Sequence, residues 1–187
     1  MFSVGDIDVK GLQRFENMLG ALGTEAPKAV NRAINRTGDM ARTRVVKTLA
    51  KQTGLPQKTI RKLVKVKRST WADLSYNMSA AGGDVSLKFF KSRETRKGVT
   101  AFVRGKRQLY EGTFMKGGSF VRGRVALKMG GHVFLRIGNR TDLEKQKSGV
   151  VIPAEMVDGA TREEFERTVE QQLPRRLDHE IGRILGI

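Results

Sequence analysis

The sequence predicts an α+β fold, with helices at both ends of the chain and antiparallel strands between them. Apolar residues recur every three or four positions over residues 1–65 and again over 154–187, which is the spacing of one helix face. Over residues 66–153 they alternate or run together over strand-like lengths, separated by glycines. We therefore expect one domain, residues 1–187, built from these three parts.

Two helices are predicted in succession near the N-terminus. Residues 9–23 place apolar side chains on one face and end at Gly23, after which Thr24 is expected to cap a helix that continues to about residue 52. The buried face of this long helix is predicted from a row of small and apolar residues: Val30, Ala33, Ile34, Gly38, Met40, Ala41, Val45 and Leu49. Because these residues are small, another backbone can pack closely along most of the helix.

A short basic helix is expected after the long one. Gly54 ends the long helix, Pro56 begins the short one, and Ile60 and Leu63 face the core. The solvent side of this short helix is predicted to carry Lys58, Arg61, Lys62 and Lys65.

The middle of the chain is predicted to form an antiparallel sheet with a long basic loop or hairpin. Strands are expected at residues 66–70, 73–79, 84–90, 98–104 and 132–138. The Gly82-Gly83 pair is a hairpin signal between the second and third of these strands. Residues 111–124 are rich in glycine and basic residues, so we expect them to be exposed as a loop or hairpin tip.

The last helix is predicted to begin with a capping box and to bend in its middle. Residues 150–157 should form a short buried segment that leads into it. Thr161 and Glu164 have the spacing at which a hydroxyl and a carboxylate cap each other's backbone. Pro174 removes one helical hydrogen bond and crowds the preceding turn, so we expect a kink or break near Leu173.

The charge of the chain is large and unevenly distributed. There are 36 Lys and Arg against 19 Asp and Glu, which gives a formal net charge of +17. Residues 28–68 hold thirteen basic residues and one acid, and residues 88–147 hold sixteen and four. Residues 155–187 hold eight acids and five bases. This separation lets copies of the chain pair with one another, and the positive excess suits polyanionic partners.

The residue types of catalytic and metal sites are sparse in this sequence. There are no cysteines, and His132 and His179 have no metal-ligand spacing with each other or with carboxylates. The stretch at 115–123 lacks phosphate-loop and dinucleotide-binding patterns, and no serine stands in a nucleophile elbow. We therefore expect no enzyme activity, cofactor or metal. Signal-peptide and membrane-spanning patterns are also missing, so we expect synthesis in the cytoplasm and no membrane partner.

Nucleic-acid binding is an alternative function that the charge suggests. A free-standing basic protein of this kind would contact phosphates without reading sequence. The stretch "QTGLPQKTIRKLVKV" imitates a helix-turn-helix, but its second helix is short and lacks the Asn, Gln and Arg grouping that contacts base edges. Aromatic residues that stack on unpaired bases are also few, with one Trp and two Tyr.

Three stretches in the N-terminal half carry a family resemblance: "VKGLQRFENMLGAL", "KAVNRAINRTGDMART" with its Ala33-Ile34-Asn35-Arg36 tetrad, and "IRKLVKVKRST". Later, "HVFLRIGNR" and a short apolar segment with Pro153 precede a helix that contains Leu173-Pro174. In this order and spacing, they resemble the minor tail protein Z family of long-tailed bacteriophages, a group of tail-completion proteins. The likeness covers nearly the whole chain, and its motifs are structural.

The resemblance implies a structural virion protein that completes the head-proximal end of a phage tail and helps join tail to head. It implies a ring in the neck that matches the sixfold symmetry of the tail, hence a homohexamer assembled in the host cytoplasm. The implied neighbours are the tail terminator or tail tube and the head-completion proteins, with possible nonspecific contact to packaged DNA.

A ring subunit joins its copies through two different patches, so a basic and an acidic surface are expected to meet between neighbours. The basic residues expected to face another subunit or DNA are Arg32, Arg36, Arg61, Lys62, Lys116, Arg122 and Arg124. The acidic residues expected at the interface are Glu163, Glu164 and Glu166, at the start of the last helix.

Overall fold

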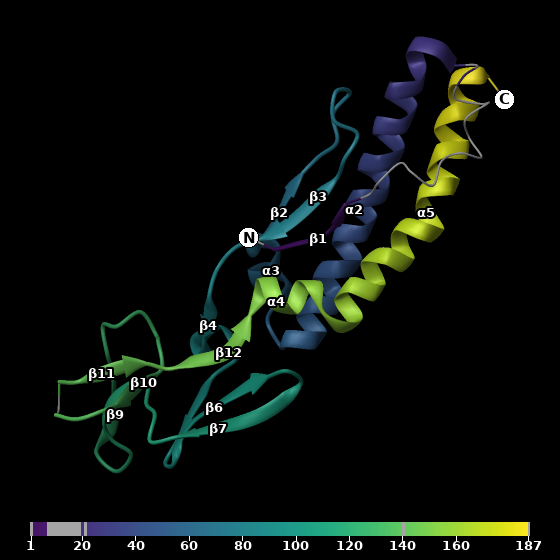
Figure 1. The fold of residues 1–187 in the computed structure, drawn as a ribbon. Helices are drawn as coiled ribbons and strands as arrows, with labels where there is room; N and C mark the ends of the chain where they lie inside the picture. Colours follow the sequence, from purple (N-terminus) through teal and green to yellow (C-terminus); the bar gives the residue numbers. More distant parts are fainter. Residues whose placement is uncertain (1, 7–19, 21, 140, 187) are drawn as a thin grey trace.

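The structure is a computed structural model that describes residues 2–6, 20, 22–139 and 141–186. Two long helices, α2 (Ala26–Thr53) and α5 (Gly159–Leu185), lie side by side, and a strand-rich end extends away from them (Figure 1). All strand pairs are antiparallel, so the α+β prediction is confirmed. Most of the helix predicted at 9–23 lies outside the described residues.

Helix α2 forms where the sequence predicts a long helix, but its start differs in detail. Thr24 lies inside a 3-10 turn, η2 (Gly23–Glu25), whose backbone runs directly into α2. Thr24 therefore does not cap the helix, because the preceding residues are already in helical conformation and no side-chain cap forms. Gly54 ends α2 as predicted, in the left-handed conformation that glycine adopts without strain.

The two long helices pack through rows of residues spaced by four. On α2 the buried row is Ala29, Ala33, Thr37, Ala41, Val45, Leu49 and Thr53. On α5 the matching row is Thr161, Phe165, Val169, Leu173, Leu177 and Ile181, of which Val169 is partly buried. Rows at this spacing form the ridges that interlock between helices, and the alanines of α2 let α5 approach closely. Each fully buried large apolar side chain contributes roughly 1.5–3 kcal/mol.

A three-stranded sheet covers another side of α2. It has the order β1 (Phe2–Asp6), β3 (Asn77–Ala80) and β2 (Val64–Lys67). The short helix α3 (Gln57–Leu63) leads directly into β2, with Ile60 buried. Tyr76, which precedes β3, is fully buried against Gly38 of α2, where a side-chain carbon would overlap its ring. Gly38 is therefore required because the tyrosine ring occupies the space beside the helix.

The hairpin predicted at Gly82-Gly83 is wrong. Strand β3 pairs with β1 and β2, whereas β4 (Asp84–Ser86) pairs with β12 (Lys147–Val151). The Asp84 carboxylate accepts hydrogen bonds from the backbone N–H groups of Ser148 (3.1 Å) and Gly149 (2.8 Å). This contact fixes β4 against a strand far away in the sequence, so the two glycines connect different sheets.

The strand-rich end consists of several small sheets. They are formed by β5 (Arg93–Thr95), β6 (Gly98–Val103) and β7 (Lys106–Glu111), by β8 (Lys116–Ser119) and β9 (Gly123–Ala126), by β10 (Phe134–Arg136) and β11 (Leu143–Lys145), and by β4 with β12. The strands expected at 98–104 and 132–138 are confirmed as β6 and β10. The segment at 84–90 is β4 followed by a 3-10 turn, η3 (Leu87–Phe89). The exposed basic hairpin predicted within 111–124 is also confirmed, as β8 and β9.

The C-terminal part begins with a short helix, α4 (Ile152–Val157), which is buried as predicted for 150–157. The predicted capping box is wrong, because Asp158 caps α5 by accepting from the Gly159 N–H at 2.8 Å. Thr161 instead donates to Gln52 of α2. Helix α5 runs through Pro174 without a break, and the kink remains a prediction.

Candidate functional site

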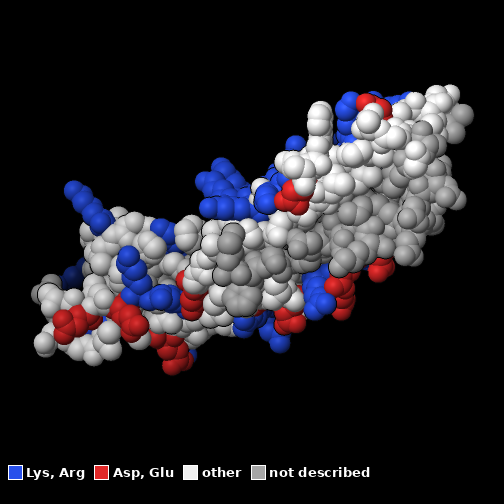
Figure 2. Space-filling view, turned by 45° about the horizontal axis from the view of Figure 1, so that its top comes forward, with Lys and Arg blue, Asp and Glu red and all other residues white. Residues whose placement is uncertain are grey.

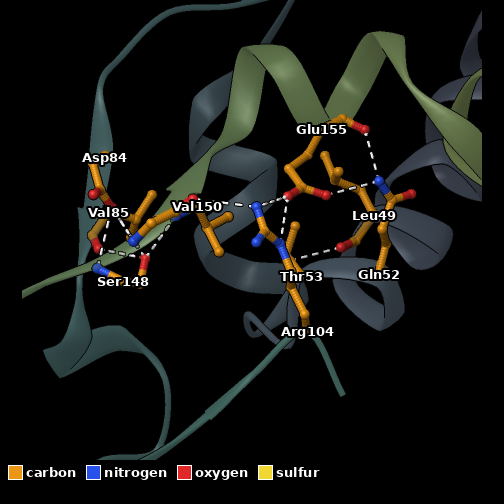
Figure 3. Close-up of polar contacts among 10 residues, drawn as sticks. Leu49, Gln52, Thr53, Asp84, Val85, Arg104, Ser148, Val150 and Glu155 are labelled. Carbon is orange, nitrogen blue, oxygen red and sulfur yellow. Dashed lines mark hydrogen bonds and ion pairs between the residues drawn. The ribbon is translucent and has the colours of Figure 1, made fainter. Parts of the chain in front are cut away.

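A polar cluster joins the helices to the strand-rich end (Figure 3). The Glu155 carboxylate of α4, whose side chain is 12% exposed, accepts from Arg104 Nε at 2.9 Å and from Gln52 Nε2 at 2.8 Å. Arg104, in the turn between β6 and β7, also donates to the Gly149 carbonyl at 3.2 Å, and its backbone N–H donates to Thr53 at 2.9 Å. We call Gln52, Arg104 and Glu155 the junction.

The junction also depends on close backbone approach and on α5. Gly54 has a φ of +84°, and a Cβ there would lie 2.5 Å from the Phe102 carbonyl oxygen. The Thr161 hydroxyl donates to Gln52 Oε1 at 2.7 Å. Five elements, α2, α4, α5, the β6–β7 turn and β12, therefore meet here. Sequence reasoning missed this cluster because its residues are isolated along the chain and match no motif.

The basic row of α2 borders a hollow beside α5. Arg32 and Arg36 are exposed and line a space of about 470 Å³, together with Arg176 and His179 of α5. Asp39, in the same hollow, is occupied within the chain, since it accepts from Arg68 at 2.5 Å and from the Tyr76 hydroxyl at 3.2 Å. Burial, followed by the negative charge of Asp39, raises the pKa of Tyr76.

The structure separates the candidate residues of the basic hairpin into two kinds. Lys116 and Arg122 are exposed. Arg124 is only 19% exposed, forms an ion pair with Glu94, and donates to the carbonyls of Lys116 and Gly118. Its guanidinium carbon also lies 4.8 Å from the Phe120 ring centroid. Arg124 therefore fixes the shape of the hairpin within its own chain.

The tip of this hairpin is apolar as well as basic. Val121 is 93% exposed, and Phe120 and Val125 are also exposed. We call Phe120, Val121 and Arg122 the hairpin tip. An apolar group held on a fixed hairpin is typical of a surface that contacts another protein.

The three acidic candidates differ in the same way. Glu164 is 16% exposed and pairs with Arg167 and, at 3.7 Å, with Arg44 of α2. Glu166 pairs with Arg162 at 2.8 Å. Glu163 is exposed, and it has no ion pair with the residues that the structure describes. The chain thus brings its basic helix and its acidic helix start together internally, while a contact between subunits at these residues stays a prediction.

The two remaining basic candidates lie on α3. Arg61 and Lys62 are exposed and, with Lys58 and Gln57, line a hollow of about 510 Å³. Figure 2 shows Lys and Arg side chains gathered in groups, one of them near the middle of the upper edge. Most of the Asp and Glu side chains visible in that view lie along the lower edge.

His132 is the histidine with the most contacts, and its contacts do not suit catalysis. Lys88 Nζ lies 2.9 Å from Nε2 and Ser86 Oγ lies 2.9 Å from Nδ1. An ammonium has no acceptor, so Nε2 accepts, and Nδ1 carries the proton and donates to Ser86. His132 therefore cannot take a proton from Ser86. Burial and then the positive charges of Lys88 and Lys145 lower its pKa.

Two searches of the described residues bear on other classes of site. No cluster of three or more His, Cys, Asp and Glu side chains with the geometry of a metal site occurs among them. Within the same residues, no helix has both the length and the apolar character needed to cross a membrane.

The comparison with protein families identifies the chain. The model of the family described as prophage minor tail protein Z (GPZ) matches residues 9–187. No curated protein and no solved structure matches the chain. The chain therefore belongs to the prophage minor tail protein Z family and is a structural component of a phage tail, as the sequence resemblance predicts.

Proposed function

We propose that this minor tail protein completes the head-proximal end of the tail and helps join the tail to the head, as one subunit of a ring in the neck. The family supports a tail protein, and the site geometry supports a role in assembly. We infer a homohexamer next to the tail terminator or tail tube and the head-completion proteins. The role is structural and needs no chemical step.

The observation that carries this proposal is the hairpin tip. Arg124 holds the hairpin in shape through Glu94 and two carbonyls, so the tip keeps its conformation without a partner. Exposed apolar side chains on a fixed support bind another protein with little loss of conformational entropy. Arg122 adds a positive charge, so the complementary surface on a neighbour is apolar with acidic residues around it.

The role in assembly is tested by removing the protein from the virus. Particles assembled without it should contain tails that fail to complete or to join heads, as seen by electron microscopy. Normal infectious particles that lack the protein would overturn the proposal. Native mass spectrometry of the purified chain, alone and with tail tubes, gives the number of subunits in the ring.

The hairpin tip is tested by the double substitution Phe120→Ser and Val121→Ser. Since both side chains are exposed, the free energy of unfolding should change by less than about 0.5 kcal/mol. Incorporation into particles should fall about tenfold or more. Leu185→Ser is the control, because Leu185 is similarly exposed at the far end of α5. Equal incorporation of both variants would show that the tip makes no contact in assembly.

A further inference from the structure

The exposed side of α3 and the start of β2 form a cationic surface, the α3 face, made by Lys58, Arg61, Lys62 and Lys65. These four side chains fall within eight consecutive positions and are all exposed. They form no ion pair with a carboxylate of the described residues. Their neighbours differ, since Lys67 pairs with Asp73 at 2.8 Å and Arg68 pairs with Asp39 at 2.5 Å. The α3 face therefore carries charge that its own chain does not neutralise.

The backbone beneath the α3 face is well fixed. Ile60 is fully buried and Leu63 is packed against the same core, on the side of α3 opposite the cations. Gly54 reverses the chain before α3, and after it Val64 pairs with Ala80 in the sheet. The four cations consequently project from a surface of fixed shape. Binding there costs side-chain entropy and no folding of the backbone.

The composition of the α3 face favours one class of partner. Surfaces that bind proteins are depleted in lysine and enriched in aromatic and large apolar residues. The α3 face has three lysines and one arginine, and its large apolar residues, Ile60 and Leu63, are turned inward. No acidic residue occurs between Asp39 and Asp73 in the sequence. Exposed Lys and Arg with nearby polar groups are the usual contacts of a phosphate backbone.

We propose that the α3 face binds the phosphodiester backbone of DNA without reading its sequence. This inference rests on the proposed place in the neck, through which the packaged DNA must pass. The hollow lined by Gln57, Lys58, Arg61 and Lys62, about 510 Å³, lets an anionic group approach three cations and an amide donor. In a ring, copies of this face would present a repeated band of positive charge to the duplex.

The size of the effect follows from counterion release. Each phosphate neutralised by a cation changes the slope of log K against log salt by about 0.9. Removing three of the cations should therefore reduce that slope by about 2.7. A loss of net charge elsewhere on the protein should change it much less, because distant charges are screened within about 10 Å.

The test measures binding of the full-length chain to short duplexes of two unrelated sequences, by fluorescence anisotropy over a range of salt concentrations. The test variant combines Lys58→Gln, Arg61→Gln and Lys62→Gln. The control combines Lys106→Gln, Lys128→Gln and Lys147→Gln, which removes the same charge from exposed positions of the strand-rich end. Circular dichroism of all three proteins verifies that they are folded.

The expected result is that the test variant loses about 2.7 from the slope and at least about tenfold in affinity, equally for both duplexes, whereas the control changes the slope by less than about one. Equal losses in both variants would mean that binding follows net charge alone, and the proposal would be overturned. Absence of binding by the unaltered chain would overturn it too. A test variant that binds DNA normally but is not incorporated into particles would assign the α3 face to a protein partner.

The same variant separates this inference from the proposed function. If DNA binding is unchanged while particles lacking the protein remain defective, only the DNA contact is refuted. If particles lacking the protein are normal, the proposed function fails whatever the duplex measurements show.

Discussion

The helical region and the strand-rich end bury their apolar residues very differently. In the helical region, α2, α5, α3 and the first sheet share one continuous core, and its exposed large apolar residues, among those described, are Trp71 and Leu185. The strand-rich end exposes many more: Phe89, Phe102, Leu109, Phe120, Val121, Val125 and Ile137. The comparison teaches that the helices supply stability, while the strands keep apolar surface available for contact with other proteins.

The sheets of the two regions differ in support as well. Sheets of two or three short strands are marginally stable in water unless they pack against another element. The first sheet packs on α2 through Tyr76, whereas the strand-rich end meets the helices at the junction. We therefore expect substitutions in the helical core to affect the whole molecule, and substitutions at the junction to uncouple its two regions.

The largest effect is expected from Gly38→Ala in the helical core. Alanine favours helix by up to about 1 kcal/mol over glycine, but its methyl group would overlap the ring of Tyr76. Because Tyr76 is fully buried, the ring cannot move aside, and we expect a net loss of about 2 kcal/mol in the free energy of unfolding. Urea unfolding followed by Trp71 fluorescence measures it.

Gly83→Ala is the control for this substitution, because nothing lies within 4 Å of the Cβ position of Gly83 and its φ is not in the left-handed region. We expect a change under about 0.5 kcal/mol. If the two alanine variants were equally stable, the tight contact between α2 and Tyr76 would not limit stability.

A somewhat smaller effect is expected from Glu155→Ala at the junction. The substitution leaves Arg104 and Gln52 without their shared acceptor, which we expect to cost about 1–3 kcal/mol. The loss should appear mainly as faster hydrogen exchange in β6, β7 and β12, with α2 and α5 still protected. Glu144→Ala, at an exposed position of β11, is the control. Uniformly faster exchange in both regions would contradict the separation between them.

The smallest effect is expected from the two tyrosines, one in each region, at high pH. Burial raises the pKa of both Tyr76 and Tyr110 above the ordinary value of 10.0, with a larger rise at Tyr76. Because the folded chain holds the phenol proton to a higher pH than the unfolded chain, this stabilisation is complete below pH 10. It is lost progressively as the pH rises above 10 toward the raised pKa.

We therefore expect the free energy of unfolding to fall above pH 10, and this fall to be reduced by Tyr76→Phe more than by Tyr110→Phe. At neutral pH, Tyr76→Phe should cost about 1 kcal/mol, since it removes the hydrogen bond to Asp39. Urea unfolding at neutral and alkaline pH measures both effects. A larger change at high pH from Tyr110→Phe would place the less solvated phenol in the strand-rich end.

The sequence predicts those features that depend on neighbouring residues. The helix of residues 24–52 and its buried row follow from a repeat of three and four, and Gly54 ends it for a local reason. The basic hairpin of residues 111–124 follows from glycine content, and the family follows from the order of several stretches along the whole chain. Each of these signals is present in a continuous stretch of sequence.

Only the tertiary structure decided which distant groups meet. Asp84 binds the backbone at Ser148 and Gly149, which places β4 beside β12 and excludes a hairpin at Gly82-Gly83. Thr161 is drawn to Gln52, so Asp158 caps α5 in its place.

The same holds for the charged candidates. Arg124 and Glu164 appeared available to partners by sequence, yet Glu94 and Arg44 occupy them within the chain. Such pairs form between positions as much as 124 residues apart, as between Arg44 and Thr168. Local pattern fixes which residues form helices and which surfaces are charged, whereas the packing of distant segments determines which charges remain free for a partner.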